Sequence, residues 1–276
     1  MMNNELRPYE DYKSIDLPWI DTIPAHWNIL RNKNVMSQSK TLVGNNHKDY
    51  KLLSLTLNGV IARDMSNPKG KFPKEFDTYQ VVNENDLVFC LFDIDETPRT
   101  VGLSPMKGMI TGAYNVFNVF NANERFLYYY YLALDNAKLL KPLYTGLRKV
   151  ISADSFLRTK LPVPPRDEQD QIVKYLDNKL AKINKFIKAK KKLIAVLKEQ
   201  KQAIINQAVT KGIDPKVKMK PSGIEWLGDV PEHWEICKLK KYAKINPSIN
   251  RIRNKYSLDD KVVFLAMESI SVDGKI

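Results

Sequence analysis

The sequence predicts an α+β protein: a mixed globular domain, then one long helix, then the start of a second, similar domain. Three observations carry this prediction. Short apolar stretches separated by loop-forming residues fill the first half, an uninterrupted seven-residue apolar repeat follows, and a phrase from the beginning of the chain returns near its end. We expect the first domain at 1–160, the helix at 161–210, a linker at 211–222 and the second domain at 223–276.

The composition bounds the class of protein. The chain has 276 residues, 43% of them hydrophobic, which is enough to bury a core. Its 44 Lys and Arg against 31 Asp and Glu give a net charge of +13, which favours a polyanionic partner. The N-terminus lacks the apolar stretch of a signal peptide, and the apolar run Leu87 to Phe92 is far too short to span a membrane. Cys90 and Cys237 lie far apart without metal-ligand spacing, so we expect a cytoplasmic protein with no membrane partner and no metal site.

Residues 50–125 follow the pattern of strands and loops. The stretches "YKLLSLTL", "DLVFCLF" and "YNVFNVF" are separated by "NPKGKFP", "DETPRT" and "SPMKG". The tract "RFLYYYYLALDNAKLLKPL" comes next and predicts a helix whose Tyr and Leu side chains lie mostly in the core. These elements together predict the first globular domain.

A long helix is predicted from Asp167 to Val209, because this segment contains neither Pro nor Gly. The prolines of "LPVPPR" end the preceding structure, and Asp167 and Glu168 suit the positive end of a helix. Residues 160–220 hold 16 Lys and Arg and 6 Asp and Glu, so most of the net charge of the chain is concentrated here. These lysines either contact DNA or face the solvent, and we favour the solvent.

Apolar residues recur every seven positions along this helix, which predicts packing against other helices. Only Lys190 and Lys201 interrupt this apolar seam. Each large apolar side chain left in water would cost about 1.5 kcal/mol or more. We therefore expect a homodimer in which a second copy of the chain packs antiparallel onto the helix. The seam consists of Val173, Leu176, Leu180, Ile183, Ile187, Ile194, Leu197, Ile204 and Ala208.

The phrase "LPWIDTIPAHWNI" near the start returns as "IEWLGDVPEHWEI", 207 positions later. A weaker echo, at an offset of 215, joins "LSLTLNGVI" and "FLAMESISVDGKI". A Trp beside a Pro is typical of a packing anchor rather than of a ligand site, so we interpret the phrase as the start of each globular unit. The identical pairs are Trp19 and Trp226, Pro24 and Pro231, His26 and His233, Trp27 and Trp234, and Ile29 and Ile236.

In their order, these features resemble the specificity subunit of type I restriction-modification systems. The resemblance rests on the "W…IPxHW" opening, the strand-rich domain, the "LPVPPRDEQDQIVKYLD" entry to the helix, the "AIINQAVTKG" exit and the renewed "SGIEWLGDVPEHW". It covers nearly the whole chain. The chain departs from the family pattern because the second recognition domain is missing after Ile276.

The resemblance implies a non-catalytic subunit that recognises double-stranded DNA. In this family each target-recognition domain reads one half-site, while the long helices set the spacing and hold methyltransferase subunits. Restriction subunits join through the complex. The resemblance further implies no cofactor in this chain, since S-adenosylmethionine, ATP and Mg²⁺ would act in the partner subunits.

The loops of the first domain supply the candidate DNA-binding residues. "RDMSNPKGKFPKEF" has the composition of an exposed loop, and "TGLRKVISADSF" adds two cations and a serine. "FDIDETPRTVGLSPMKGMITGAYNVF" resembles the central region of one branch of recognition domains. Arg can bond guanine in bidentate fashion, and acidic or hydroxyl groups can accept from cytosine N4. The candidates are Arg63, Lys69, Lys71, Lys74, Asp93, Arg99, Thr100, Lys107, Arg148, Lys149 and Ser152.

Two alternatives belong to other classes. "LVFCLFDIDETP" matches the opening motif of haloacid-dehalogenase-like phosphatases, in which Asp93 would attack phosphorus and Asp95 would act as acid and base beside Mg²⁺. The paired acids expected downstream of such a motif are not convincing in this sequence. The second alternative is a coiled-coil interaction protein that does not bind DNA. A methyltransferase or ATPase is disfavoured because the chain lacks the Gly-rich and Asn-Pro-Pro-aromatic segments of such enzymes.

Overall fold

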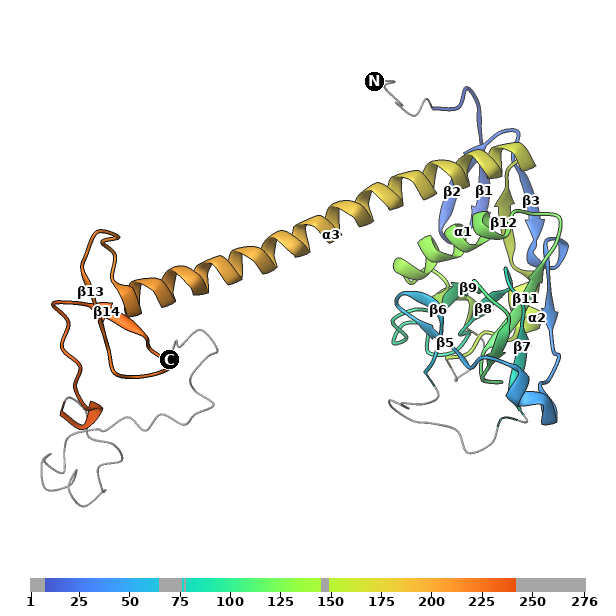
Figure 1. The fold of residues 1–276 in the computed structure, drawn as a ribbon. Coiled ribbons are helices and arrows are strands. Elements are labelled where there is room, and N and C mark those ends of the chain that lie inside the picture. Colours follow the sequence, from blue (N-terminus) through green and yellow to red (C-terminus); the bar gives the residue numbers. More distant parts are fainter. Residues whose placement is uncertain (1–7, 65–75, 77, 145–148, 242–276) are drawn as a thin grey trace, which may run out of the picture. The chain divides into compact units, whose positions relative to one another are not determined.

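A computed structural model describes residues 8–64, 76, 78–144 and 149–241 (Figure 1). The chain divides into two compact units, residues 1–187 and 188–276. The helices are α1 (Glu124–Asn136), α2 (Ala153–Arg158) and α3 (Arg166–Lys211), with short 3₁₀ turns η1 (Asn32–Asn34), η2 (Gly44–Asp49), η3 (Lys141–Leu143) and η4 (Leu239–Lys241). The strands are β1 (Tyr12–Leu17), β2 (Ile20–Pro24), β3 (Asn28–Arg31), β4 (Met36–Ser39), β5 (Leu53–Thr56), β6 (Gly59–Ala62), β7 (Gln80–Val82), β8 (Leu87–Phe89), β9 (Val101–Leu103), β10 (Gly108–Ile110), β11 (Asn115–Val119), β12 (Lys160–Val163), β13 (Met219–Pro221) and β14 (Asp229–Pro231).

The predicted α+β class is confirmed. The largest sheet is antiparallel with strand order β4-β11-β8-β9, and the first unit also contains the two-stranded antiparallel pairs β1-β2, β3-β12, β5-β6 and β7-β10. Side chains alternate between its faces, because successive residues of a strand point to opposite sides. Leu87, Phe89 and Phe117 enter the large core that α1 and α2 help to form, whereas Val88 and Val116 join a second cluster on the other face.

Helix α1 contains the tyrosine-rich tract and begins directly after Asn123, which caps its N-terminus. The Asn123 side chain accepts hydrogen bonds from the backbone N–H groups of Arg125 and Phe126, as a helix N-cap does. Tyr131 is buried in the core and bonds to Asn32. The helix ends at Asn136, earlier than the predicted tract, and Lys138 then takes a positive φ of 52°. The chain reverses here because a residue in the left-handed region cannot continue an α-helix.

Helix α3 is a single helix of 46 residues, about 69 Å at ~1.5 Å per residue. It follows the prolines of β12 and ends before Gly212, whose φ of +78° is typical of a helix terminus. Its start agrees with the predicted entry at Asp167. Residues 160–163, where the predicted helical region begins, instead form β12 and pair with β3, since proline disfavours a helix interior.

The first copy of the repeated phrase holds the start of α3. Hairpin β1–β2 leads to His26 and Trp27, whose ring nitrogens lie 2.8 and 3.1 Å from the two carboxylate oxygens of Glu168. The Tyr9 hydroxyl bonds to the same carboxylate. Four residues, which we call the Glu168 clasp, thus fix the N-terminal hairpin to the first turn of α3. The expectation that the phrase is structural is consistent with this contact.

The second copy of the phrase repeats the backbone of the first. In β1–β2 Tyr12 pairs with Pro24, and in β13–β14 Met219 pairs with Pro231, which is the same register at an offset of 207. The turn that follows is repeated as well: the Trp27 N–H donates to Pro24 at 3.0 Å, and the Trp234 N–H donates to Pro231 at 2.9 Å. The stretch expected to be a linker at 211–222 therefore contains the strand β13. The weaker echo that ends at Ile276 lies outside the described residues.

Candidate nucleic-acid interface

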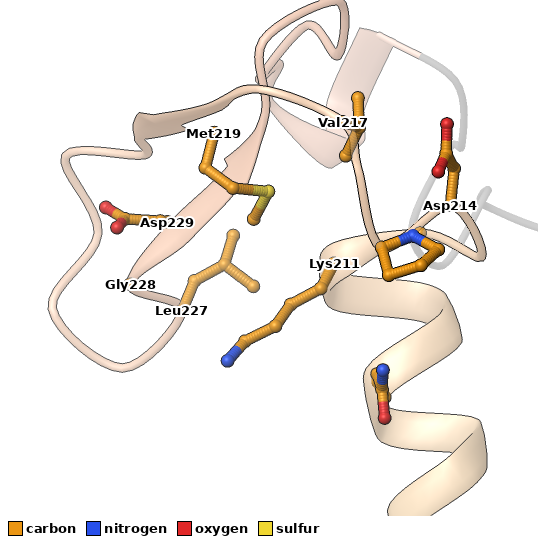
Figure 2. A pocket seen from close by; sticks show the side chains of 10 residues that line it. Lys211, Asp214, Val217, Met219, Leu227, Gly228 and Asp229 are labelled. Atoms are coloured by element: carbon orange, nitrogen blue, oxygen red, sulfur yellow. The ribbon is translucent and has the colours of Figure 1, made fainter.

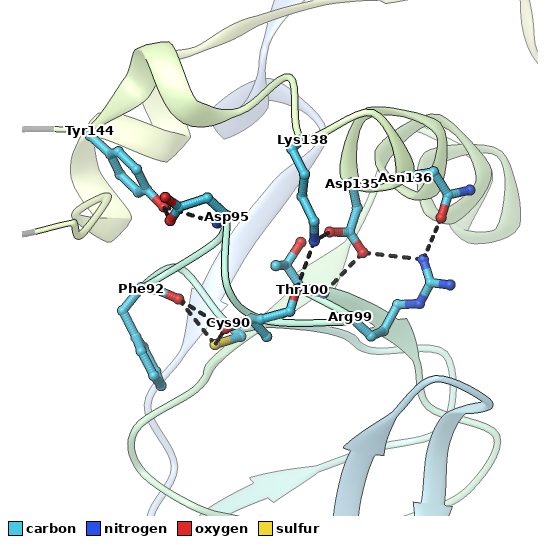
Figure 3. Close-up of polar contacts among 10 residues, drawn as sticks. Cys90, Phe92, Asp95, Arg99, Thr100, Asp135, Asn136, Lys138 and Tyr144 are labelled. Atoms are coloured by element: carbon cyan, nitrogen blue, oxygen red, sulfur yellow. Dashed lines mark hydrogen bonds and ion pairs between the residues drawn. The ribbon is translucent and has the colours of Figure 1, made fainter.

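Two of the predicted DNA-binding residues, Arg99 and Thr100, lie beside the buried carboxylate of Asp135 (Figure 3). Asp135 is 1% exposed and accepts from the Arg99 guanidinium at 3.1 Å, the Lys138 ammonium at 2.8 Å and the Thr100 backbone N–H at 3.0 Å. Arg99 also donates to Asn136 at 2.9 Å. The cluster joins α1 to the segment before β9, so Arg99 is held inside the fold.

Thr100 is 0% exposed, and its hydroxyl oxygen makes no hydrogen bond with any described residue. A fully buried side chain offers no surface to a DNA base. We therefore leave Thr100 out of the interface proposed below.

The segments around Asp93 and Lys149 lie side by side. The Asp93 N–H donates to the Lys149 carbonyl at 2.8 Å. The Lys149 ammonium bonds to Glu96 at 2.6 Å and to Asp95 at 3.1 Å, and these two carboxylates, Glu96 first, raise the pKa of Lys149. Lys149 and then Tyr144 hold the pKa of Asp95 below its usual range. Asp93 is exposed with a φ of 45°, so its backbone is in a conformation that few residues other than glycine adopt.

The remaining candidates are distributed over other parts of the domain. Ser152 is the N-cap of α2 and accepts from the Ser155 N–H at 3.1 Å. Lys107 is exposed and lies 5.4 Å from the centre of the Tyr50 ring. Arg63 is half-buried beside β6. Lys69, Lys71, Lys74 and Arg148 lie outside the described residues.

Sequence reasoning did not find an open pocket of about 520 Å³ between β4, β7 and the turn that joins β10 to β11. Amides and hydroxyls line it, with one exposed lysine, Lys40, and one exposed leucine, Leu42. The sequence indicates this pocket only weakly, through Gln80, a polar residue within the apolar stretch "YQVV". A side-chain amide that is buried among apolar residues requires a hydrogen-bond partner. We call this pocket the amide pocket.

Among the described seam residues of α3, coverage is greatest at the beginning of the helix, and Ala208 near its end is half-buried. Val173 is buried in the core of the first unit and Leu176 is half-buried. Leu180, Ile183, Ile187, Ile194, Leu197 and Ile204 are all 39% to 59% exposed. A long apolar stripe is thus left facing the solvent in the single chain.

The second unit contains an open pocket of about 450 Å³ where α3 ends (Figure 2). Lys211 from α3, Asp214 from the following turn, and Leu227 and Asp229 near β14 contribute to its lining. The pocket is part of the junction that follows α3, and none of the predicted site residues lies in it.

The described residues contain no helix long and apolar enough to cross a membrane. Within the same part of the chain, no group of three or more His, Cys, Asp or Glu side chains is placed to hold a metal ion.

Comparison with known proteins identifies the family. The family model described as the type I restriction modification DNA specificity domain matches residues 38–196. The chain is similar to the type I restriction enzyme MjaVIII specificity subunit of Methanocaldococcus jannaschii, with 31% identity over 180 residues, 63% of this chain and 39% of that protein. It is 38% identical over 91 residues to the putative type I restriction enzyme MjaX specificity subunit of the same organism, over 31% of this chain and 19% of that protein.

Among solved structures, similarity is found to the HsdS subunit from Thermoanaerobacter tengcongensis, with a TM-score of 0.43 and 18% identity over 72% of this chain and 48% of that chain. A structure described in terms of the complex assembly and conformational transition of the type I R-M system gives a TM-score of 0.47 and 19% identity, over 71% of this chain and 48% of that chain. This chain thus spans less than half the length of these relatives. No comparison supports the phosphatase or the coiled-coil alternative. Because the family model matches more than half of its residues, the chain belongs to the type I restriction modification DNA specificity domain family.

Proposed function

We propose that this chain is a sequence-specific DNA-recognition subunit of a type I restriction-modification complex and that it reads one half-site. The observation that carries the proposal is the family match over residues 38–196, which include most of the first domain and the larger part of α3. The net charge of +13 supports a polyanionic partner. Phosphate contacts would supply affinity, while base edges would supply specificity.

The candidate DNA contacts are the cations and polar groups of the first domain. The described and accessible ones are Lys107, Asp93, Lys149 and Ser152, with Arg63 half-buried. Arg99 has a structural partner in Asp135, so its part in readout would require the guanidinium to exchange a protein carboxylate for a base.

The catalytic steps would belong to the partner subunits. We propose that α3 docks methyltransferase subunits and that restriction subunits join through them. S-adenosylmethionine, ATP and Mg²⁺ would act in those partners, and this chain would be non-catalytic by itself. Its DNA substrate implies that the complex works in the cytoplasm.

A second copy of the chain is the partner that we propose for the exposed seam. If the α3 helices of two copies pack antiparallel about a two-fold axis, the exposed residues Ile183, Ile194 and Leu197 of each copy would be covered by the seam of the other copy. Identical recognition domains would then read an inverted repeat. Lys190 and Lys201 would limit the strength of pairing, since a charged residue in a seam costs stability.

The test of the function is a gel shift with a random-sequence duplex pool, with and without a methyltransferase partner. Enrichment of one sequence motif supports a recognition subunit. Binding without any sequence preference would contradict the proposal, and failure to bind DNA in both conditions would instead favour a coiled-coil interaction protein.

A further inference from the structure

The amide pocket is built so that its polar groups have fixed directions. Gln80 is only 7% exposed, and its side-chain N–H donates to the Tyr114 carbonyl at 2.7 Å. This bond fixes which end of the amide is the carbonyl. The Gln80 carbonyl oxygen accepts no hydrogen bond from the described residues, and it is not fully buried, so it remains an acceptor at the pocket wall.

The backbone around Gln80 is held on two sides. Leu42 forms a β-bridge with Gln80, and the Val81 N–H donates to the Thr41 carbonyl at 2.8 Å. A Cβ atom at Gly112 would lie 2.5 Å from the Thr78 carbonyl oxygen, so the β10–β11 turn approaches β7 as closely as only glycine permits. The pocket is therefore a preformed feature of the fold.

Two more amides, Gln38 and Asn115, line the same pocket, and the described residues give neither side chain a hydrogen-bond partner. Both are half-buried, so their rotamers are restricted while their polar ends remain accessible. Leu42, 60% exposed, adds an apolar surface at the pocket, and Lys40 adds a positive charge. None of the lining residues is acidic, so nothing in the lining repels a phosphate.

This set of groups discriminates among the bases. Cytosine is read by an acidic acceptor, which the lining lacks, and guanine by the donors of Arg or Lys, of which the lining has one, Lys40, against three side-chain amides. A side-chain amide matches adenine, because its oxygen accepts from N6 while its N–H donates to N7. An apolar side chain matches the methyl group of thymine, the partner base in the same pair.

We propose that the amide pocket reads one A·T base pair from the major groove, with Gln38, Gln80 and Asn115 facing adenine and Leu42 facing the thymine methyl group. Lys40 contacts a neighbouring phosphate. The inference rests on the proposed function, since it names where and how the chain reads its half-site. None of these residues was among the candidates drawn from the sequence.

The experiment begins by selecting bound duplexes from a random pool with the full chain and its methyltransferase partner. At each A·T pair of the selected site, adenine is replaced by 7-deazaadenine, which lacks the N7 acceptor, or thymine by uracil, which lacks the methyl group. At one pair, both replacements should weaken binding by the wild type. Each replacement removes only part of the contact, so its effect should lie below the roughly 150-fold that corresponds to the loss of a strong bidentate contact.

Pocket variants then connect the base atoms with the side chains. The double variant Gln38→Ala and Asn115→Ala lacks the amides that would donate to N7. It should therefore bind the normal duplex and the duplex with 7-deazaadenine at that pair with equal affinity. Leu42→Ala should lose its sensitivity to uracil and keep its sensitivity to 7-deazaadenine. Lys40→Ala should weaken all sequences alike, because a phosphate contact carries no sequence information. Asn34→Ala, an exposed amide in η1 outside the pocket, is the matched control and should change nothing.

The outcomes separate the two levels of the proposal. If the wild type selects no sequence, the recognition function itself is wrong. If it selects a sequence but the pocket variants keep every base preference and every analogue sensitivity, only the assignment of the amide pocket is wrong. A change of preference at one position cannot arise from misfolding, since an unfolded domain would lose binding to all sequences.

Discussion

Asp135 is the buried charge on which the local structure of the first unit depends most directly. Its carboxylate forms ion pairs with Arg99 and Lys138 and accepts a hydrogen bond from the Thr100 backbone N–H, although it is almost completely shielded from solvent. A buried ion of this kind is tolerated only when its partners are present, because the energy lost by removing it from water must be recovered in direct bonds. Arg99 and Lys138 therefore contribute to stability through Asp135.

Replacing Asp135 by Ala should destabilise the first unit by about 3 kcal/mol, since it removes the buried carboxylate that Arg99 and Lys138 share. Chemical denaturation monitored by circular dichroism measures this. Asp154→Ala removes an exposed ion pair with Arg158 and should have little measurable effect. Equal stabilities of the two variants would show that the Asp135 cluster is not a structural element.

Thr100→Val should leave the protein as stable as the wild type or stabilise it by about 1 kcal/mol. The substitution replaces a buried hydroxyl that has no described partner with a methyl group of similar size. Thermal unfolding measures the stability, and the gel shift should remain unchanged. A loss of stability above 1 kcal/mol would indicate that the hydroxyl has a partner, such as a buried water.

At this scale the sequence predicted residue types better than residue roles. Arg99 and Thr100 were chosen because such side chains can read bases, but Asp135 lies 35 residues away from Thr100 in a helix predicted to be mostly core. Pairing of this kind depends on the tertiary fold. The same limit hid Gln80, whose direction is set by the backbone carbonyl of Tyr114 in the turn between β10 and β11.

Helix α3 is anchored through polar and acidic side chains on its first four turns. Besides the Glu168 clasp, the Asn123 backbone N–H donates to the Gln169 side-chain oxygen, and the Asn123 side-chain amide donates to the Asp170 carboxylate. The Asp177 carboxylate accepts hydrogen bonds from Arg125 and Tyr129 of α1. Burial tends to raise the pKa of Glu168, but hydrogen bonds from Tyr9, His26 and Trp27 outweigh it and lower the pKa. The pKa of Asp177 is likewise lowered by Tyr129 and Arg125 against the effect of burial.

This anchor should weaken in acid. A carboxylate whose pKa is lower in the folded state stabilises the fold at pH values above its unfolded pKa, which for Glu168 is near 4.5. The stabilisation is lost as the pH falls through the lower folded pKa. Glu168→Gln should cost about 1 kcal/mol at neutral pH, allowing for partial exposure. Thermal unfolding of both proteins between about pH 7 and pH 3 should show the difference disappearing at the acid end, and a difference that persists there would contradict the role of the charge.

The exposed seam gives a prediction about association. Leu197→Asp should dissociate the proposed pair, because it places a charge among apolar residues that would otherwise be buried. Analytical ultracentrifugation measures the mass with and without the methyltransferase partner. Lys198→Asp places the same charge at the adjacent exposed position, outside the seam, and serves as the control. A wild-type monomer in both conditions would show that the seam has another partner.

For the molecule as a whole, the basic composition predicts strong dependence of DNA binding on salt. The logarithm of the binding constant should fall linearly with the logarithm of salt concentration, with a slope of about −0.9 for each phosphate neutralised. Lys107→Ala should reduce the slope by about one unit if this exposed lysine contacts a phosphate. Fluorescence anisotropy with a labelled duplex provides the measurement, and an unchanged slope would remove Lys107 from the interface.

At the scale of the whole molecule, the sequence predicted the order of the parts because each has a local signature. The seven-residue repeat predicted α3, and the repeated phrase predicted the start of each globular unit, where the structure has the hairpins β1–β2 and β13–β14. The pairing of β12 with β3 was beyond such reasoning, since these strands are more than 120 residues apart and short strands carry little information about their partners. The domain boundaries therefore remain predictions.

The equal register of β1–β2 and β13–β14 has a genetic consequence. Three residue pairs of the two hairpins correspond at an offset of 207, and so does the hydrogen bond from each tryptophan N–H to the proline carbonyl that ends the hairpin. An in-frame crossover between the DNA segments that encode them would add or remove 207 residues, α3 among them, while leaving the paired backbone of the hairpin intact. The first domain and its helix can thus be inherited as one unit, and recombination can change the number of copies of this unit without the need for a new junction.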